Sequence, residues 1–211
     1  MDGEAQSAAY AEADFEAPDR AFVDRFCARY PDFVQGQVLD MGCGPAAIAR
    51  YLCETLPNIR VTGVDASGPM IAHGRRGAER AGLAERITLL QGYFPGAIPA
   101  DASFDAVISN SLLHHLPDPS VLWEELRRLV RPSAPILVTD LTRPATTDAA
   151  RAIVATYAAD EPDILQEDFY VSLLAAFTPE EVTAQLAASG LGYLVVERIS
   201  DRHLAVHGHL R

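Results

Sequence analysis

The sequence predicts an α/β fold in which helices cover both faces of a seven-stranded, mostly parallel sheet that ends in an antiparallel hairpin. Short apolar segments alternate with helical segments five times between residues 38 and 140. This alternation is typical of a parallel sheet covered by helices. Two more apolar segments follow near the C-terminal end, joined only by Ser200-Asp201-Arg202. Because three residues are too short for a crossover, these last two strands must run antiparallel.

Apolar spacing and breaking residues give the expected bounds of the helices and strands. Phe22 and Phe26 stand one helical turn apart, and Ile48 and Leu52 are separated by four residues, as on the buried face of a helix. Proline, glycine and asparagine end the segments. The expected helices cover residues 20–30, 45–56, 69–81 and 120–131, two more lie within 144–177, and one covers 178–189; the expected strands cover 38–40, 59–65, 86–91, 104–109, 135–140, 193–199 and 203–209.

Charge and cysteine content exclude several classes of protein. The net charge is −12, and all 17 basic residues are arginine. Nucleic-acid binding needs a basic face, so we expect no nucleic-acid partner. Three cysteines without a CxxC spacing predict neither a disulfide framework nor a zinc site, and they favour a cytoplasmic location. No apolar run approaches the roughly 18 residues of a membrane span, so we expect no membrane partner.

The stretch VLDMGCGPAAIAR, residues 38–50, reads as strand, tight turn and helix. Gly42 and Gly44 have no Cβ, so the backbone of the turn can approach a ligand closely. The free N–H groups at the start of the next helix would point at that ligand. We expect Pro45 at the first helical position, where no N–H is needed. The sequence therefore predicts a ligand-binding turn.

Each of the five predicted parallel strands ends in a polar residue. Open parallel sheets bind ligands outside the carboxyl ends of their strands, where the strand order reverses. Polar side chains in otherwise apolar strands therefore predict a lined pocket at that edge. The residues are Asp40, Asp65, Gln91, Asn110 and Asp140.

A nicotinamide dinucleotide site would also combine a glycine turn with an acid at the end of the second strand. Its fingerprint is GxGxxG, in which the third glycine lets the helix pack against the sheet. Here Ala47 takes that place, and the terminal hairpin also disfavours a dinucleotide domain. A dehydrogenase is therefore the least favoured reading.

The sequence resembles the class I S-adenosylmethionine-dependent methyltransferases, and among them the small-molecule enzymes with an LHH motif after the fourth strand. The resemblance runs from about residue 38 to 209 in the order that is usual in the family. It implies a Rossmann-like sheet, S-adenosylmethionine as cofactor and S-adenosylhomocysteine as product. The matching stretches are VLDMGCGP, VTGVDASGPMI, ITLLQGYF, FDAVISNSLLHHLPDP and the closing hairpin.

By this resemblance, the turn and the fourth strand hold the methionyl end of the cofactor. Gly42 and Gly44 let the backbone pass close to it, and Asp40 accepts from its amino group. Asn110 offers its backbone carbonyl to the same ammonium. The frequent third glycine of the family is Ala46 here, and we expect its methyl group to narrow the turn without abolishing binding.

The resemblance assigns the adenosyl part to the second and third strands. Asp65 takes the two ribose hydroxyls, which suits a carboxylate because it accepts through two oxygens. Ala66 and Met70 lie against the adenine, and Gln91 replaces a frequent aspartate that accepts from the adenine amino group. The loop after the third strand adds Gly92 and Tyr93.

Few catalytic side chains are expected, because the activated methyl group belongs to the cofactor. A base is needed only where the acceptor must lose a proton. His114 and His115 follow the fourth strand, and at most one of these adjacent residues should face the substrate. His115 is slightly favoured as the base and His114 as a substrate contact. Asp140 is a candidate base or substrate anchor, or else a cap for the next turn.

The resemblance also suggests how the chain is divided. Residues 1–36 would form an N-terminal arm and helix that cover the site, and residues 37–211 the methyltransferase domain. Within it, residues 144–177 would form a helical lid after the fifth strand. Tyr10 in the arm would fold over the cofactor and contact the substrate, unless the arm is disordered.

The lid is where we expect substrate recognition. Tyr157 and Tyr170 are candidate walls of an apolar pocket, although their helical spacing equally suits a core. The acidic residues between 160 and 168 read as a solvated loop or as an attraction for a cationic group. No histidine or carboxylate spacing predicts a metal site.

The sequence thus predicts a cytoplasmic methyltransferase that acts on a small-molecule substrate, with a homodimer left open. One alternative is an enzyme of natural-product assembly that binds S-adenosylmethionine but catalyses a cyclisation or rearrangement. A second is a non-catalytic partner protein that binds the cofactor for structure alone. The acceptor atom, whether O, N, C or S, is not encoded in any of these motifs.

Overall fold

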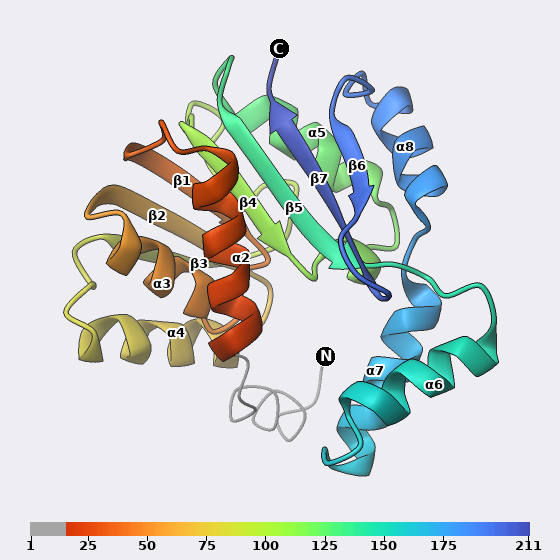
Figure 1. Cartoon of the computed structure of the whole chain (residues 1–211). Coiled ribbons are helices and arrows are strands. Elements are labelled where there is room, and N and C mark those ends of the chain that lie inside the picture. The colour runs from red at the N-terminus through yellow and green to blue at the C-terminus, as the bar shows by residue number, and fades with distance from the viewer. Residues whose placement is uncertain (1–15) are drawn as a thin grey trace.

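The computed structural model describes residues 16–211, which form a seven-stranded sheet with helices on both faces (Figure 1). The strand order is β3-β2-β1-β4-β5-β7-β6, and only β7 runs antiparallel to its neighbours. The predicted fold class is therefore confirmed. The strands are β1 (Gln35–Met41), β2 (Asn58–Asp65), β3 (Ile87–Gln91), β4 (Ala106–Asn110), β5 (Pro135–Leu141), β6 (Val195–Arg198) and β7 (His203–His209).

Eight helical segments accompany the strands in the described part of the chain, and one of them is a short 3-10 turn after β4. The α8 helix begins with the capping box that Thr178 and Glu181 predict. The segments are α2 (Glu16–Arg29), α3 (Ala47–Thr55), α4 (Gly68–Arg80), η1 (Leu113–His115), α5 (Ser120–Leu129), α6 (Thr147–Tyr157), α7 (Asp163–Ala175) and α8 (Pro179–Ala188).

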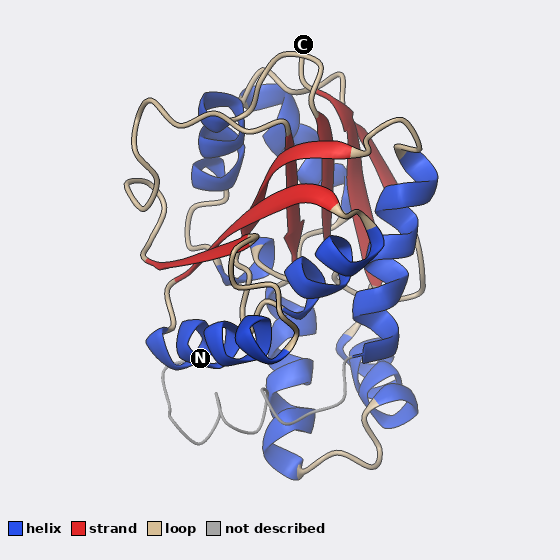
Figure 2. Cartoon of the chain, turned by 90° about the vertical axis from the view of Figure 1, so that its left-hand side faces the viewer, coloured by secondary structure: helices blue, strands red, loops and turns tan. Residues whose placement is uncertain are grey.

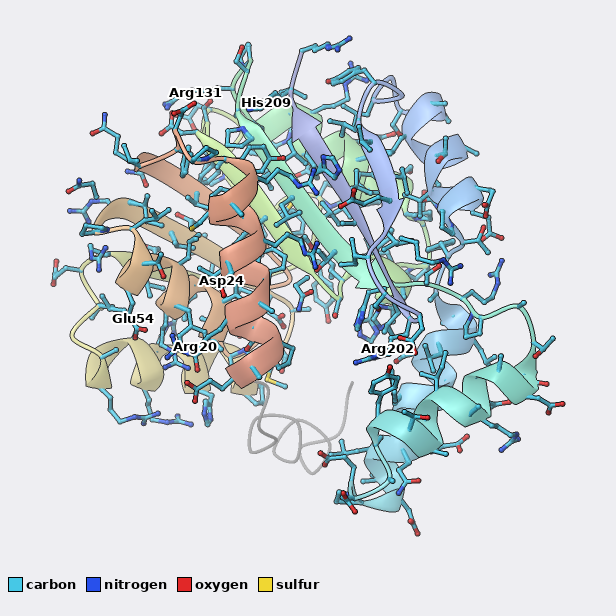
Figure 3. All side chains as sticks on the ribbon, in the orientation of Figure 1. Arg20, Asp24, Glu54, Arg131, Arg202 and His209 are labelled. Carbon is cyan, nitrogen blue, oxygen red and sulfur yellow. The ribbon has the colours of Figure 1, made fainter. Side chains whose placement is uncertain are left out.

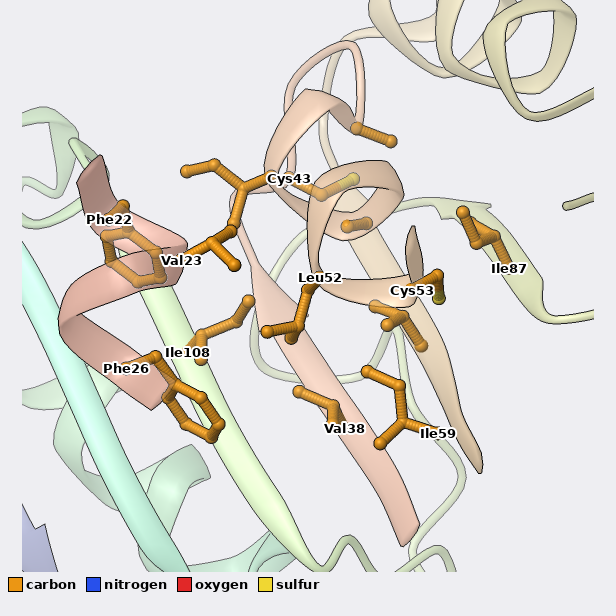
Figure 4. Close-up of a cluster of buried hydrophobic side chains, with 14 of the residues drawn as sticks. Phe22, Val23, Phe26, Val38, Cys43, Leu52, Cys53, Ile59, Ile87 and Ile108 are labelled. Atoms are coloured by element: carbon orange, nitrogen blue, oxygen red, sulfur yellow. The ribbon is translucent and has the colours of Figure 1, made fainter. Parts of the chain in front are cut away.

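Two apolar cores lie on opposite faces of the sheet, and adjacent strand residues contribute to different cores. Val38 packs into the core under α2, α3 and α4, and Leu39 into the core under α5 and α8. Figure 4 shows the first core, where Phe22 and Phe26 of α2 face the sheet. The two faces are also visible when the molecule is turned (Figure 2). The helix α2 is thus part of the core.

Two helix starts differ from the expectation. The chain is already helical at Glu16, before the expected residue 20. Pro45 lies two residues before α3 rather than at its first position, because Ala46 precedes the helix in a left-handed conformation with φ of 58°. The turn is therefore two residues longer than the sequence pattern predicts.

The pair α6 and α7 has an apolar cluster of its own and extends beyond the carboxyl end of β5 (Figure 1). Leu141 at the end of β5 packs into this cluster, and α7 contacts η1. The pair therefore borders the edge of the sheet where the parallel strands end. Within residues 16–211, none of the helices has both the length and the apolar character needed to cross a membrane.

Replacing Phe26 by alanine should destabilise the fold strongly. Its ring is fully buried and packs against Tyr30 and Phe33. Loss of a buried phenylalanine typically lowers the free energy of unfolding by about 3–5 kcal/mol. Urea denaturation of Phe26→Ala would measure the loss. Val34→Ala, at a side chain that is 54% exposed, is the control and should change stability by less than about 0.5 kcal/mol. Equal effects of the two substitutions would contradict the assignment of α2 to the core.

Candidate functional site

The turn after β1 is tied to β2 through its backbone. The N–H groups of Gly42 and Cys43 both donate to the carbonyl oxygen of Val64, at 2.9 and 3.0 Å. Gly42 has a φ of 74°, and a Cβ there would lie 2.9 Å from the Cβ of Leu112. Gly44 has a φ of 51°, but a Cβ there would meet no atom within 4 Å. One glycine thus allows close packing against the loop after β4, and the other borders open space.

Asp65 at the end of β2 holds the turn and the next helix in place. Its Oδ2 accepts from the N–H of Gly44 at 2.9 Å, and its Oδ1 accepts from the N–H of Ser67 at 2.8 Å. Ser67 in turn caps α4 through the N–H of Met70. Because a carboxylate oxygen can accept more than one hydrogen bond, both oxygens keep acceptor capacity for a ligand.

The carboxyl group of Asp40 is buried, and one of its oxygens makes no hydrogen bond to the described residues. Its side chain lies in the sheet next to the turn, the residue is 3% exposed, and its Oδ2 has no hydrogen-bond partner among the described residues. Burial raises the pKa of this carboxyl group to about 8, and the negative charges of Asp65 and Asp19 add to the effect. A buried acceptor without a partner is costly, so this site favours a ligand that brings a donor or a positive charge.

A small pocket of about 70 Å³ opens at the turn, and Asp40 is one of its lining residues. The strand order reverses between β1 and β4, which is where open parallel sheets bind ligands. Asn110 at the end of β4 also lines the pocket, as the sequence predicts for a strand-end residue. The full lining is Asp19, Asp40, Gly42, Cys43, Gly44, Pro45, Ala47, Ile48 and Asn110.

Ala46 does not narrow this turn in the way expected from the sequence. Its methyl group is fully buried and lies beside Gly74 of α4, where a Cβ would approach it to 3.2 Å. Ala46 makes no side-chain cap, and the first turn of α3 borders the pocket through Ala47 and Ile48. The uncapped start of α3 therefore points its free N–H groups toward this region.

The residues assigned to an adenosyl group differ widely in exposure. Met70 is buried, whereas Tyr93 is 76% exposed. Gln91 is exposed and donates through Nε2 to the carbonyl oxygen of Ala66 at 3.3 Å, which leaves its Oε1 as an acceptor. Gly92 donates its N–H to the carbonyl oxygen of Asp65 at 2.9 Å. These residues lie on neighbouring strand ends, but Tyr93 contributes no wall to the pocket at the turn.

His114 and Asp140 form a buried pair on the other side of β4. His114 Nδ1 and Asp140 Oδ1 are 2.6 Å apart, and the two side chains are 4% and 2% exposed. Asp140 also accepts from the backbone N–H groups of Leu113 and Leu141, each at 2.7 Å. In the neutral tautomer that donates from Nδ1 to the Asp140 carboxylate, His114 carries its free lone pair on Nε2.

His115 lies against His114, with ring centroids 4.0 Å apart. Although part of the residue is exposed, desolvation lowers the pKa of His115 to about 4, and His114 adds to this effect. A group with such a pKa is a weak proton acceptor near neutral pH.

The two tyrosines of the α6–α7 pair make specific contacts instead of lining an apolar wall. The Tyr157 hydroxyl donates to Asp201 at 2.9 Å, and the Arg202 guanidinium lies 3.3 Å from the centroid of the Tyr157 ring. Figure 3 shows Arg202 at the tip of the β6–β7 hairpin, next to α6. Tyr170 lies under the guanidinium of Arg151. Tyr10 falls outside the described residues.

Asp19 is the residue that the sequence patterns did not single out. It lies on α2, some twenty residues before the turn, and reaches the pocket only because α2 packs across the sheet beside α3. Sequence spacing carries no signal for such a contact. Across residues 16–211, no group of three or more histidine, cysteine, aspartate or glutamate residues is arranged to hold a metal ion.

The chain is similar in sequence to known methyltransferases. A family model described as a methyltransferase domain matches residues 38–133. A demethylmenaquinone methyltransferase of Porphyromonas gingivalis is 31% identical over 127 residues, which cover 60% of this chain and 52% of that protein. A trans-aconitate 2-methyltransferase of Azoarcus sp. is 32% identical over 111 residues, which cover 53% and 41% of the two chains. The chain thus spans about half or less of the length of these curated relatives.

The fold is also found among solved structures. The plantazolicin methyltransferase BpumL, solved with a triazolic desmethylPZN analogue and SAH, superposes with a TM-score of 0.72. The match covers 98% of this chain and 90% of that chain, at 14% sequence identity. At this identity the likeness establishes the fold.

Asp40→Asn should remove a pH-dependent loss of stability. The pKa of Asp40 is about 8 in the folded chain and about 3.9 when unfolded, so the folded state holds the proton more tightly. Stability from this group is therefore present below pH 4 and is lost as the pH rises toward 8. Urea denaturation without ligand, from pH 5 to 8, should show a growing stability advantage of the variant. Parallel profiles would mean that Asp40 is already ionised in the folded chain.

Proposed function

Since the chain belongs to the class I S-adenosylmethionine-dependent methyltransferases, with S-adenosylmethionine as cofactor, we propose that it transfers a methyl group to a small-molecule acceptor by in-line displacement. One observation carries the proposal. A buried carboxylate oxygen of Asp40 without a partner borders an open glycine turn at the point where strand order reverses. That arrangement fits the cationic methionyl end of the cofactor.

The chain's own residues would hold and shield the donor. Asp40 would accept from the ammonium and Asp65 from the ribose hydroxyls, while Met70 and Gln91 would contact the adenine. The cofactor supplies an activated methyl group on its sulfonium when bound. The protein then has to align an acceptor and exclude water.

His114, positioned by Asp140, is our proposed base for acceptors that must lose a proton. Asp140 fixes the proton on Nδ1 and so presents Nε2 as an acceptor. The sequence favoured His115, but desolvation lowers its pKa to about 4, which makes it a poor proton acceptor near neutral pH. Asp140 already accepts from three donors, which suits a positioning residue better than a base.

The remaining assignments concern access. The helix α7 contacts η1, and the side chain of His114 is almost completely buried. An acceptor would therefore reach the histidine only if the segment that covers it, which includes α7, moves. This supports residues 144–177 as a lid. The cytoplasmic location, a homodimer and the contact of Tyr10 stay predictions of the sequence.

The name of the Porphyromonas gingivalis relative supports the small-molecule class, since it refers to demethylmenaquinone. Neither relative reported above is named for a cyclisation, a rearrangement or a purely structural role. We therefore prefer methyl transfer to those alternatives.

Methyl transfer should be detected with S-adenosylmethionine labelled in its methyl group. Incubated with a metabolite extract and a protein extract, the protein should label the low-molecular-mass fraction. Isothermal titration should show binding of S-adenosylmethionine and S-adenosylhomocysteine but not of NAD. Label in the protein fraction alone would contradict the small-molecule acceptor. Binding without any transfer to either extract would favour the non-catalytic alternative.

His114→Ala should lower kcat by about 100-fold for an acceptor that must be deprotonated, the usual contribution of a general base. Affinity for S-adenosylhomocysteine should not change, because His114 does not line the pocket at the glycine turn. Asp140→Asn should also lower kcat. It should alter the pH–rate profile as well, because the asparagine amide no longer fixes the proton on Nδ1 of His114. Kinetics across pH and titration calorimetry would measure both effects.

The control is His209→Gln, whose side chain lies at the opposite end of the sheet (Figure 3) and should leave kcat unchanged. An unchanged rate in His114→Ala, with intact binding, would rule out His114 as the base.

A further inference from the structure

The N-terminal end of α2 reaches the pocket at the glycine turn. Asp19 lines that pocket together with Asp40, Gly42 and Gly44. No motif in the sequence connects this helix to the cofactor. Its presence at the turn therefore needs an explanation from the structure itself.

The position of Asp19 is fixed by the packing of α2. Phe22 and Phe26 are buried against the sheet, and the Tyr30 hydroxyl donates to the carbonyl oxygen of Ile136. Arg29 donates to Glu197 of β6 at 2.6 Å, so the helix end is also held by an ion pair. Close to Asp19, the guanidinium of Arg20 lies 4.1 Å from the centroid of the Tyr51 ring on α3. The carboxyl group is thus delivered to the pocket by an anchored helix.

Asp19 has no hydrogen bond or ion pair with any residue of the described chain. Burial raises the pKa of Asp19 to about 6, against the opposing attraction of Arg50. Its charge also contributes to the raised pKa of Asp40. Asp40 keeps a buried oxygen without a partner in the same pocket. Two carboxyl groups therefore line one small pocket, where Arg50 attracts Asp19 without an ion pair and one oxygen of Asp40 has no partner among the described residues.

A compact cation with several N–H donors would satisfy both groups. A primary ammonium carries three donors, whereas a sulfonium carries none. Charge-assisted hydrogen bonds to two carboxylates are stronger than neutral ones.

We propose that Asp19 is a second carboxylate for the α-ammonium of the methionyl group, opposite Asp40, and that it couples α2 to cofactor binding. The assignment rests on the proposed function, because it concerns the same cofactor. It adds a binding residue from a helix outside the glycine turn and the strand ends.

The test compares Asp19→Asn with Asp24→Asn. Asparagine keeps the size of the side chain and removes its charge. Asp24 is an exposed acid on the same helix, so its variant controls for the net charge and for the helix (Figure 3). Titration calorimetry would use three probes: S-adenosylmethionine, S-adenosylhomocysteine and an S-adenosylhomocysteine analogue that lacks the α-amino group.

Asp19→Asn should weaken binding of S-adenosylmethionine and of S-adenosylhomocysteine about tenfold or more. Binding of the deamino analogue should be the same in the wild type and the variant, because the group that Asp19 contacts is missing. Asp24→Asn should bind all three probes like the wild type. The melting temperature without ligand shows whether the variants fold, and removal of an unpaired carboxylate should not lower it.

Three outcomes would overturn the proposal. If Asp19→Asn behaves like Asp24→Asn, Asp19 does not contact the cofactor. If it weakens only S-adenosylmethionine, the carboxylate acts on the sulfonium. If it weakens the deamino analogue equally, Asp19 merely supports α2. In each case the wild type still binds the cofactor and the proposed function stands, whereas a wild type that binds none of the probes would overturn both.

Discussion

From β1 the chain adds β2 and then β3 on one side of β1. It then crosses over and adds β4 on the other side. Strand order reverses there, which is where open parallel sheets bind ligands. The polar groups that line the pocket at the glycine turn are brought together by this reversal. Asp40, Gly44 and Asn110 come from segments up to seventy residues apart, yet they border one pocket. No local motif could bring them together without the sheet.

The same constraint creates an electrostatic cost. Asp40 is carried into a buried position between the apolar residues Leu39 and Met41 of β1, and Asp19 and Asp65 add negative charge around it. Burying a carboxylate without a partner opposes folding. Its persistence at the turn is understandable if the carboxylate serves a cationic ligand, because binding then neutralises charge that folding left unbalanced. The Asp40 carboxylate thus both destabilises the unliganded fold and provides the proposed contact to the ligand.

Much of the architecture could be predicted because it depends on local apolar patterns. The strands ending in Asp65 and Asn110 and the terminal hairpin follow from such patterns. The left-handed conformation of Ala46 could not be predicted, since alanine rarely adopts it and the surrounding packing decides it. The place of Asp19 in the pocket could not be predicted, because it depends on tertiary packing alone. The choice between His114 and His115 depends on which ring the 3-10 turn directs toward Asp140, and adjacent positions in a sequence do not reveal that.

The proposed acceptor side of the site differs physically from the proposed donor side. Backbone groups and strand ends fix the donor side, whereas the acceptor side is bounded by α6 and α7, which have a core of their own. Tyr157 links α6 to the hairpin tip through Asp201 and Arg202. Exposed contacts of this kind contribute only about 0.5–1 kcal/mol each. A proposed lid held by such contacts can open at low cost, and His114 would become reachable without disturbing the turn that we propose to hold the cofactor.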